Sequence, residues 1–291
     1  MQLFDFSAYK LSGITYGGSE KKIGILIDGF PYMLKFQKKT PFGFRFNTIS
    51  EYLGSHIFKI LGFDCQDTYL GVYGKENVVA CKDFVNDSVQ FVPFNDVGES
   101  TIEEDKEKFQ YSYEDITELL KINKKITNVS ETISSFFEVY IVDALLGNFD
   151  RHGNNWGFLK KENKYRLAPI FDNGSCLFPN LVNEDKMRLV IRDEKEIDKR
   201  VYDFPTSQIK LDGNKSSYYG VISSLKYDEI NKALLKIYPL IDLDKIYSLI
   251  QDISIISDIH KEFYKIMVKN RYEKILKNSY DKLVDKKNEN I

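Results

Sequence analysis

The densest run of chemically capable side chains lies at residues 146–159, which read Leu-Gly-Asn-Phe-Asp-Arg-His-Gly-Asn-Asn-Trp-Gly-Phe-Leu. Asp150 and Asn155 lie on this run, and Asp172 follows within Ile-Phe-Asp-Asn-Gly. Phosphoryl transfer needs a carboxylate that accepts or orients the attacking hydroxyl, and oxygen ligands that hold Mg²⁺ against the phosphates. Asp150 can supply the first, and Asn155 with Asp172 can supply the second. The spacing therefore predicts phosphoryl transfer assisted by Mg²⁺.

Such a site also needs a lysine and a backbone cradle for the phosphates, and two upstream features offer them. The sequence from Gly13 to Lys22 is rich in glycine, but it is neither a GxGxxG nor a Walker A motif. Lys35 interrupts the apolar run Tyr32–Phe36, where strand alternation places it on the face opposite Tyr32. Alone, each feature is also typical of a polar loop or of a solvated lysine. Together with the downstream motif, they predict that Lys35 contacts phosphate.

The first 85 residues, which carry this lysine, are rich in strand signals. The strands expected here are 23–28, 32–36, 68–73 and 77–81. Asp28-Gly29 is a hairpin signal between the first two strands. Apolar residues at helical spacing predict a helix over Asn47–Leu61. Thr48 and Glu51 have the spacing of a capping box at its start.

After about residue 112 the sequence becomes helical. A strong helix begins near Ser130 and ends at Gly147, because glycine readily adopts the left-handed conformation that ends helices. Two short strands, 156–159 and 165–170, and helical patterns near 228–238, 243–256 and 258–277 follow. Protein kinases place their catalytic Asp, an Asn and a metal-binding Asp in this way. We predict an α+β, two-lobed, protein-kinase-like fold. A β-rich N-lobe with one main helix would span residues 1–85, and a mostly helical C-lobe residues 86–291, in one catalytic unit.

Composition, charge and cysteine spacing indicate a globular protein and argue against several other classes of protein. Hydrophobic residues make up 43% of the 291 residues and charged residues 29%, which is typical of a globular chain. The 41 basic and 43 acidic residues nearly balance, so direct nucleic-acid binding is not expected. Cys65, Cys81 and Cys176 form no CxxC pair, which argues against a disulfide framework or a zinc site.

The sequence also bears on location. No apolar run approaches the roughly 18 residues that a membrane span needs. Asp5 interrupts the region where a signal peptide would be apolar. We expect a cytoplasmic protein without a membrane span, while leaderless secretion or translocation as an effector stays open.

Several segments follow one another in an order that is characteristic of a known family. They are the Gly17–Lys22 loop, the Tyr32–Phe36 strand with Lys35, the Glu51–Leu61 helix, the Val79–Phe84 hinge, the Gly147–Asn155 loop and the Asp172 element. In this order they resemble the HipA-like serine/threonine protein kinases, and most closely the short CtkA-type kinases, which lack HipA's extra N-terminal subdomain. The resemblance spans roughly residues 10–180, and its specific part is the Asp150–Asn155 and Asp172 motifs.

The resemblance implies ATP and Mg²⁺ as cofactors and a role for each matched residue. Asp150 would be the catalytic base, and Asn155 with Asp172 would bind Mg²⁺. The nucleotide would be held by Lys35 at the phosphates, by backbone groups near Lys82 and Phe84 at the adenine, and by the loop residues Gly17, Gly18, Ser19 and Lys22.

The roles of His152, Glu51 and Thr15 are less certain from the sequence. His152 sits where the family places residues near the nucleotide, which implies a catalytic or nucleotide-binding role. It could equally brace the loop by hydrogen bonds. Glu51 is the obvious candidate for an ion pair with Lys35, but its spacing puts it nearly opposite the apolar stripe of its helix, as a capping-box glutamate would be. HipA is regulated by phosphorylation just before its glycine loop, and Thr15 falls at that place. Autophosphorylation of Thr15 is therefore a hypothesis.

The resulting prediction is an ATP- and Mg²⁺-dependent protein kinase that acts on serine and threonine, with autophosphorylation. Two alternatives stay open: a lipid kinase of the phosphoinositide type, and a non-catalytic nucleotide-binding regulator or toxin-module protein. The expected partners are a protein substrate and an antitoxin-like or host protein. The mixed charges of Lys186–Arg200 are typical of an exposed surface segment, but this segment could also be a substrate-docking or activation-segment region, because it follows Asp172.

Overall fold

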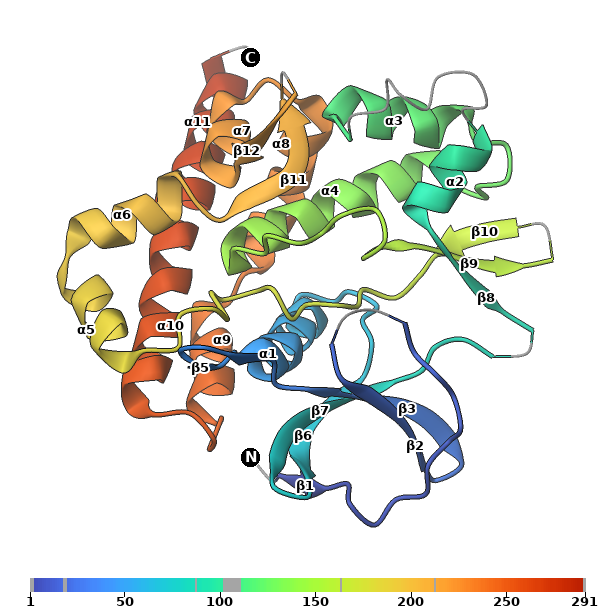
Figure 1. Ribbon diagram of the computed structural model, residues 1–291. Coiled ribbons are helices and arrows are strands. Elements are labelled where there is room, and N and C mark those ends of the chain that lie inside the picture. Colours follow the sequence, from blue (N-terminus) through green and yellow to red (C-terminus); the bar gives the residue numbers. More distant parts are fainter. Residues whose placement is uncertain are drawn as a thin grey trace. The chain divides into compact units, whose positions relative to one another are not determined.

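A hairpin with a two-residue turn lies within the first sheet, as the Asp28-Gly29 signal predicts. In a computed structural model, which describes residues 3–17, 20–86, 88–101 (98–101 without side chains), 111–162, 164–211 and 213–289, Ile27 pairs with Phe30 across this turn (Figure 1). Asp28 and Gly29 both have positive φ, 51° and 82°, which is the conformation of a type I′ turn. The prediction of this hairpin is confirmed.

The chain divides into two compact units, which are described separately. Unit 1 comprises Met1–Asn86, Pro169–Arg192 and Leu243–Lys265, and unit 2 comprises Asp87–Ala168, Asp193–Asp242 and Ile266–Ile291. The functional division into lobes at residues 85 and 86 stays a prediction.

Unit 1 is built on a five-stranded sheet in the order β1-β6-β7-β3-β2. Its strands are β1 (Phe4–Asp5), β2 (Lys22–Ile27), β3 (Phe30–Phe36), β6 (Thr68–Tyr73) and β7 (Glu76–Lys82). All neighbours pair antiparallel except β1 and β6. A buried cluster lies on one face of the sheet and includes Tyr32, Leu34 and Phe36 of β3. Alternation along β3 therefore directs Lys35 to the other face.

Helix α1 (Asn47–Ile60) packs against β6 and β7. The helix has the predicted range, but the predicted capping box is wrong. Phe46 occupies the N-cap position, and its ring offers no acceptor for the first backbone N–H groups. Thr48 is buried, and Glu51 faces Lys35 instead of the helix start. Glu51, which the local pattern assigned to the helix cap, instead forms an ion pair with Lys35.

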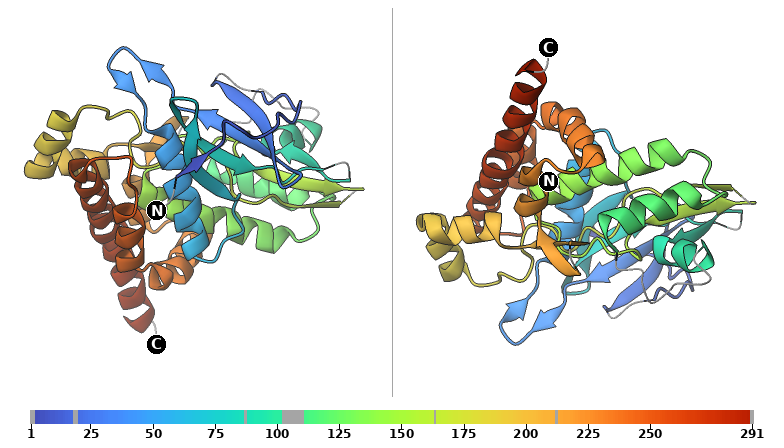
Figure 2. Two further views of the ribbon diagram at one scale, coloured as in Figure 1. Left: turned by 90° about the horizontal axis from the view of Figure 1, so that it is seen from below. Right: turned by 90° about the horizontal axis from the view of Figure 1, so that it is seen from above.

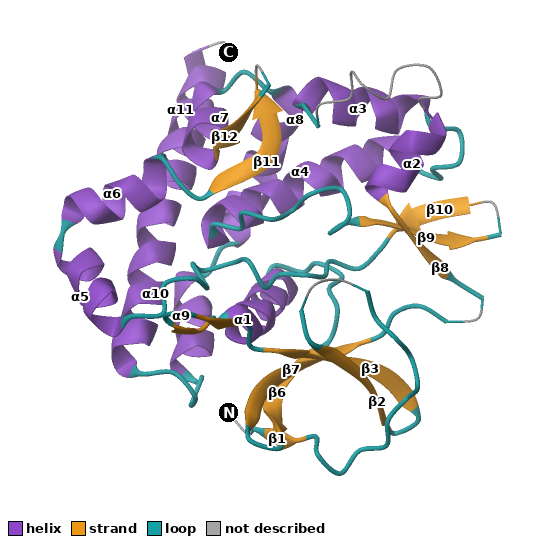
Figure 3. Cartoon of the chain, viewed as in Figure 1, coloured by secondary structure: helices purple, strands orange, loops and turns teal. Residues whose placement is uncertain are grey.

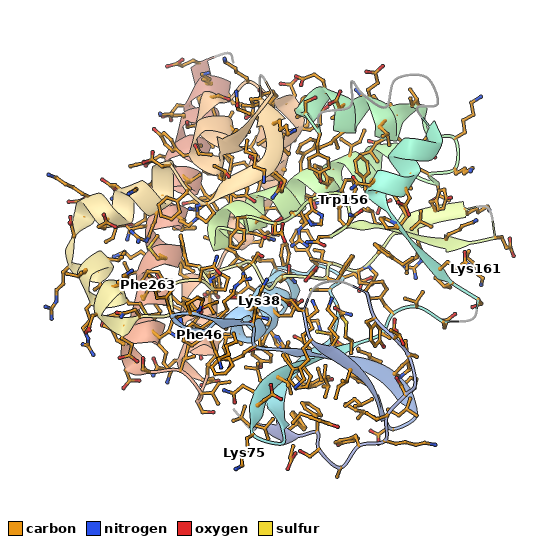
Figure 4. All side chains as sticks on the ribbon, in the orientation of Figure 1. Lys38, Phe46, Lys75, Trp156, Lys161 and Phe263 are labelled. Atoms are coloured by element: carbon orange, nitrogen blue, oxygen red, sulfur yellow. The ribbon has the colours of Figure 1, made fainter. Side chains whose placement is uncertain are left out.

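The rest of unit 1 comes from three places in the sequence. The elements are the hairpin β4 (Lys39–Thr40) and β5 (Gly43–Phe44), helix α5 (Glu184–Arg192), helix α9 (Leu243–Gln251) and the first part of α10 (Asp258–Arg271). The hairpin projects from unit 1 in both views of Figure 2. The Phe46 ring lies 4.0 Å from His260, and Phe263 lies 5.8 Å from Phe178 (Figure 4). These contacts hold the start of α10 in unit 1.

Unit 2 is organised around the long buried helix α4 (Val129–Leu146). Its N-cap is Asn128, not Ser130, whereas its end at Gly147, with φ of 62°, is as predicted. Unit 2 also contains a three-stranded sheet of β8 (Gln90–Pro93), β9 (Gly157–Lys161) and β10 (Lys164–Leu167). Strand β9 follows the Asp150 loop directly in the chain. The remaining elements are α2 (Phe94–Thr101), α3 (Tyr113–Ile122), α6 (Glu194–Tyr202), β11 (Thr206–Leu211), β12 (Asn214–Ser217), α7 (Tyr218–Ser224), α8 (Asp228–Ile237), a 3₁₀ turn (Tyr238–Leu240), a π-helical turn (Tyr272–Lys277) and α11 (Asn278–Glu289).

Figure 3 shows strands concentrated in the first part of the chain and helices in most of the rest, as the α+β prediction required. Lys186–Arg200 forms parts of α5 and α6, whose charged side chains are mostly exposed, as predicted for a surface segment. The same helices bury Met187, Val190 and Ile197, which the sequence interpretation did not single out. In the part of the chain that the structure describes, no helix is long and apolar enough to cross a membrane.

Candidate active site

Three charged side chains meet in unit 1 around the amino group of Lys35. Its Nζ lies 2.8 Å from Oε2 of Glu51 and 2.8 Å from Oδ1 of Asp172. The Lys35 and Glu51 side chains are 6% and 1% exposed, whereas the Asp172 side chain is 41% exposed. The structure thus settles the question that the sequence left open, because Glu51 does pair with Lys35.

The two carboxylates keep this buried lysine charged. Burial by itself lowers the pKa of Lys35, but the negative charges of Asp172 and Glu51 outweigh it and hold the pKa well above its ordinary value. A buried cation with a fixed position is suited to bind phosphate oxygens, which carry the opposite charge.

The segment that carries Asp172 is fixed against α1. The backbone N–H of Asn173 donates to Oε1 of Glu51 at 3.0 Å, and its side-chain amide donates to Oγ of Ser55 at 3.0 Å. A Cβ at Gly54 would lie 2.7 Å from the Asn173 Cβ, so only glycine permits this approach. Asp172 itself has φ of 57°, a strained conformation for a residue with a side chain. These contacts hold its half-exposed carboxylate beside Lys35.

In unit 2, the loop that bears Asp150 is anchored on the buried Asp143 of α4. The guanidinium of Arg151 donates to both Asp143 oxygens, from Nε at 2.9 Å and from Nη2 at 3.0 Å. The amide of Asn148 donates to the same carboxylate at 2.9 Å, and its backbone N–H to the Asp143 carbonyl at 3.0 Å. Sequence reasoning missed Asp143, Asn148 and Arg151. The available signal was a carboxylate within the otherwise apolar run Ile141–Leu146.

Side chains from elsewhere in unit 2 hold the carbonyl groups of the same loop. The donors and their acceptors are Tyr218 Oη to the Asn148 carbonyl at 2.6 Å, Gln208 Nε2 to the Phe149 carbonyl at 2.6 Å, and Tyr111 Oη to the Arg151 carbonyl at 3.1 Å. Trp156, labelled beside α4 in Figure 4, donates in turn to the Tyr111 hydroxyl. Burial raises the pKa of Tyr111 far above its ordinary value, so this hydroxyl stays protonated. The loop backbone is therefore held from several sides.

The predicted catalytic residues lie close together on this loop. The Asp150 backbone N–H donates to Oδ1 of Asn148 at 3.0 Å, and the Asn155 amide nitrogen donates to the Asp150 carbonyl at 2.8 Å. Nδ1 of His152 accepts from the Asn154 backbone N–H at 3.2 Å, and its Nε2 lies 3.7 Å from an Asp150 oxygen. His152 therefore braces the loop, as one of its two interpretations predicts.

Each of the two units presents oxygen atoms of the kind that Mg²⁺ prefers. In unit 2, the Asn155 amide nitrogen donates to the Asp150 carbonyl, and the Oδ1 of the same side chain is an oxygen of this kind. In unit 1, the half-exposed Asp172 carboxylate offers oxygens of the same kind. Within the described ranges no cluster of three His, Cys, Asp or Glu side chains forms a complete metal cage.

Apart from His152, which lies in unit 2, the residues predicted to hold the nucleotide lie in unit 1. Lys22 donates from Nζ to the Gly17 carbonyl at 2.6 Å, while Gly18 and Ser19 lie outside the described residues. Both backbone groups of Lys82 are engaged: its N–H donates to the Asp67 carbonyl, and its carbonyl accepts from Gln66. The next N–H, of Asp83, donates to the Pro31 carbonyl, and the Phe84 ring lies 5.5 Å from Phe171. Contact of this segment with adenine stays a prediction.

We expect Arg151→Lys to slow phosphoryl transfer by about 10²-fold, because a lysine cannot reproduce the two-pronged contact with Asp143 and lets the loop shift. The loss should appear in kcat, with the KM for ATP nearly unchanged, in steady-state kinetics. Arg166→Lys, an exposed arginine on β10, is the matched control. Equal kcat values for both variants would contradict the anchoring role.

Comparison of the sequence with known proteins shows the family to which the chain belongs. Residues 14–233 match the family described as HipA-like C-terminal domain. The serine/threonine-protein kinase CtkA of Helicobacter pylori (strain J99) is 36% identical over 267 residues, which cover 89% of this chain and 81% of that protein.

Solved structures also resemble the chain, and two of them are described. The crystal structure of a Helicobacter pylori proinflammatory kinase CtkA matches with a TM-score of 0.88 and 33% identity, and it covers 98% of this chain and 99% of its own. HipA in the Shewanella oneidensis MR-1 complex with HipB and operator DNA matches with a TM-score of 0.57 over 92% of this chain and 67% of that chain. At 15% identity, the second likeness shows the fold alone.

Proposed function

The chain belongs to the family of the HipA-like C-terminal domain, and from that membership we propose that it transfers the γ-phosphate of Mg²⁺-bound ATP to serine and threonine hydroxyls of proteins. The predicted enzyme class, a serine/threonine protein kinase, is confirmed by the likeness to CtkA over most of the chain. The observation that best supports the proposed cofactors is the buried Lys35 held between Glu51 and Asp172.

Each residue of the two described clusters has a role in the proposal. Lys35 binds phosphate oxygens of ATP, and Glu51 fixes its amino group. Asn155 and Asp172 would hold Mg²⁺, which would neutralise negative charge on the transferred phosphoryl group. His152 acts by bracing the loop beside Asp150.

In the proposed reaction, Asp150 acts on the substrate hydroxyl. Its carboxylate accepts the hydroxyl proton as the oxygen forms a bond to the γ-phosphorus. The bond from that phosphorus to the bridging oxygen breaks, and ADP leaves with the electron pair. Since little covalent chemistry is asked of the protein, positioning by the anchored loop and charge stabilisation supply most of the catalysis.

The direct test uses purified protein, Mg²⁺ and γ-labelled ATP, with a generic protein acceptor and, separately, phosphoinositide vesicles. Label on serine or threonine of protein supports the proposal. Label in lipid alone would replace it by the lipid-kinase alternative, and ATP binding without any transfer would replace it by the regulator alternative.

Autophosphorylation of Thr15 is a second expected result. Thr15 is exposed, in the segment that precedes Gly17. Phosphopeptide mapping after incubation with Mg²⁺ and ATP should show phosphate on Thr15. Thr15→Ala should remove that peptide's label, whereas Ser7→Ala, at another exposed hydroxyl, should leave it. An unmodified Thr15 in active protein would refute the hypothesis.

The proposed partners are a protein substrate and an antitoxin-like or host protein. The fold shared with HipA is compatible with an antitoxin-like partner, but it names no partner for this chain.

A further inference from the structure

The ring of Tyr16 lies over the face of the first sheet that carries Lys35. In the antiparallel pairs β2–β3 and β3–β7 (Figure 1), residues directly opposite each other share a face, and Met33 lies opposite both Gly24 and Cys81. Met33 precedes Lys35 by two residues, so this row shares the face of Lys35, about 7 Å along the strand. A Cβ at Gly24 would lie 3.2 Å from Cε2 of Tyr16. The lack of a side chain at Gly24 therefore leaves room for the ring.

The hydroxyl of Tyr16 reaches the hinge that ends β7. It donates to Oδ2 of Asp83 at 3.1 Å, while Oδ1 of that carboxylate accepts the Val85 backbone N–H at 3.0 Å. The Asp83 backbone N–H donates to the Pro31 carbonyl, which continues the β3–β7 ladder by one position and places Asp83 on the face of Lys35. Burial and the negative charge of Asp83 raise the pKa of Tyr16, so its hydroxyl stays protonated and can donate. Tyr16 thus ties the segment before β2 to the hinge.

The ring lies on the strip of the sheet where the proposed nucleotide needs its base. The proposed function puts the phosphates at Lys35 and the base at the hinge, so the base must lie on the face of Lys35, beside the hinge. Tyr16 lies on this face and extends from Gly24 to Asp83. A tyrosine ring and a purine base both present flat apolar faces with hydrogen-bonding groups at the edge, so one can take the place of the other.

We propose that Tyr16 occupies the place of the base when no nucleotide is bound, and that ATP must displace it. Tyr16 is then a competitor built into the chain. It lowers the affinity for ATP and adenosine alike, because they bind only to the fraction of molecules whose ring has moved out. The inference rests on the proposed function, since it takes the base to bind at the hinge. It deepens that function by naming the residue that sets the affinity for the nucleotide.

The test measures the binding of Mg²⁺-ATP, adenosine and tripolyphosphate by isothermal titration calorimetry, and it needs no turnover. Tyr16→Ala removes the ring, so it should bind ATP and adenosine at least about ten-fold more tightly than the wild type. Tyr16→Phe loses only the part-buried hydrogen bond to Asp83, so it should gain about three-fold. Tripolyphosphate has no base, so its affinity should be the same for all three proteins.

Two control variants separate this effect from a general loosening of the sheet. Tyr9→Phe removes a tyrosine hydroxyl beside the buried cluster on the opposite face of the sheet. Leu11→Ala shortens an exposed side chain, and the bridge between Leu11 and Ile25 places it on the face opposite Lys35. Both controls should change the affinity for ATP by no more than about two-fold. Thermal unfolding of each variant checks that the protein is folded.

The outcomes distinguish this inference from the proposed function. Tighter binding of ATP and adenosine by Tyr16→Ala, with tripolyphosphate unchanged, supports the inference. Unchanged or weaker binding of adenosine by Tyr16→Ala would overturn it. If the wild type still transfers label to protein in that case, the proposed function stands and only the role of Tyr16 falls. If neither the wild type nor any variant binds ATP, the proposed function fails and the inference fails with it.

Discussion

Replacing Asp150 by asparagine should lower the rate of phosphoryl transfer by about 10²–10⁴-fold, the usual contribution of a general base. Asparagine has the same shape but cannot accept the hydroxyl proton. The backbone contacts of residue 150 with Asn148 and Asn155 do not involve the carboxylate, so the loop should keep its conformation. ATP binding, measured by calorimetry, should therefore stay within a few-fold of wild type while labelling of a protein acceptor disappears.

Two further variants make this result specific. Asp185→Asn, at an exposed aspartate on α5, should leave labelling unchanged. Asp172→Asn should weaken the binding of Mg²⁺-ATP itself, because it removes a charged metal ligand and one partner of Lys35. Labelling by Asp150→Asn at the wild-type rate would refute its role as the base.

Lys35→Met should destabilise the protein by about 3–5 kcal/mol, the usual cost of leaving a buried charge without its partner. Glu51 is 1% exposed, and without the lysine its carboxylate keeps only the N–H of Asn173 among the contacts described above. The same change should abolish labelling, because it removes the cation proposed to bind the phosphates. Urea unfolding followed by circular dichroism measures the loss of stability.

The double variant Lys35→Met/Glu51→Gln separates the two effects. It removes both buried charges, so it should recover much of the lost stability. Labelling should stay absent because the cation is still missing. If the double variant were as unstable as the sum of its single changes, the pair would not be coupled as the geometry requires. Lys82→Met, on the neighbouring strand β7, controls for the loss of a lysine from the sheet.

Local patterns of the sequence predict much of the fold and part of the candidate site. The turn at Asp28-Gly29, helix α1 and the end of α4 at Gly147 follow from residue types whose backbone preferences act over a few positions. The Asp150–Asn155 loop could be found in the same way, because its residues are close in the sequence and their spacing matches a known chemistry.

Features that depend on distant pairing could not be predicted in this way. Helical periodicity placed Glu51 away from the apolar stripe, where a glutamate is usually exposed. The sequence alone cannot distinguish an exposed glutamate from one that is buried in an ion pair. The structure makes this distinction, because it brings Glu51 of α1 into contact with Lys35. Asp143 is similar, since its role depends on Arg151 and Asn148 folding back onto α4. The nucleotide-contact and metal assignments stay predictions.

Helices α5 and α6 were missed for a different reason. Their exposed faces carry so many charges of both signs that the few apolar residues among them, such as Met187 and Val190, do not stand out. Strands β11 and β12 are short and polar, and β8 pairs with β9 across many intervening residues. Pairing of this kind is set by neighbours in space and not by propensity.

The discontinuous make-up of unit 1 has a consequence for how the chain folds. Its sheet is complete by residue 82, but Glu51 receives the Asn173 N–H from 122 residues away, and Phe46 meets a ring on α10. During synthesis from the N-terminus, the first contact must wait until Asn173 has left the ribosome, and the second must wait until His260 has left it. Closing such long loops is slow. The nascent chain therefore carries a complete sheet whose Lys35–Glu51 pair lacks Asp172 and Asn173 until those residues have been made, a period in which chaperone protection matters most.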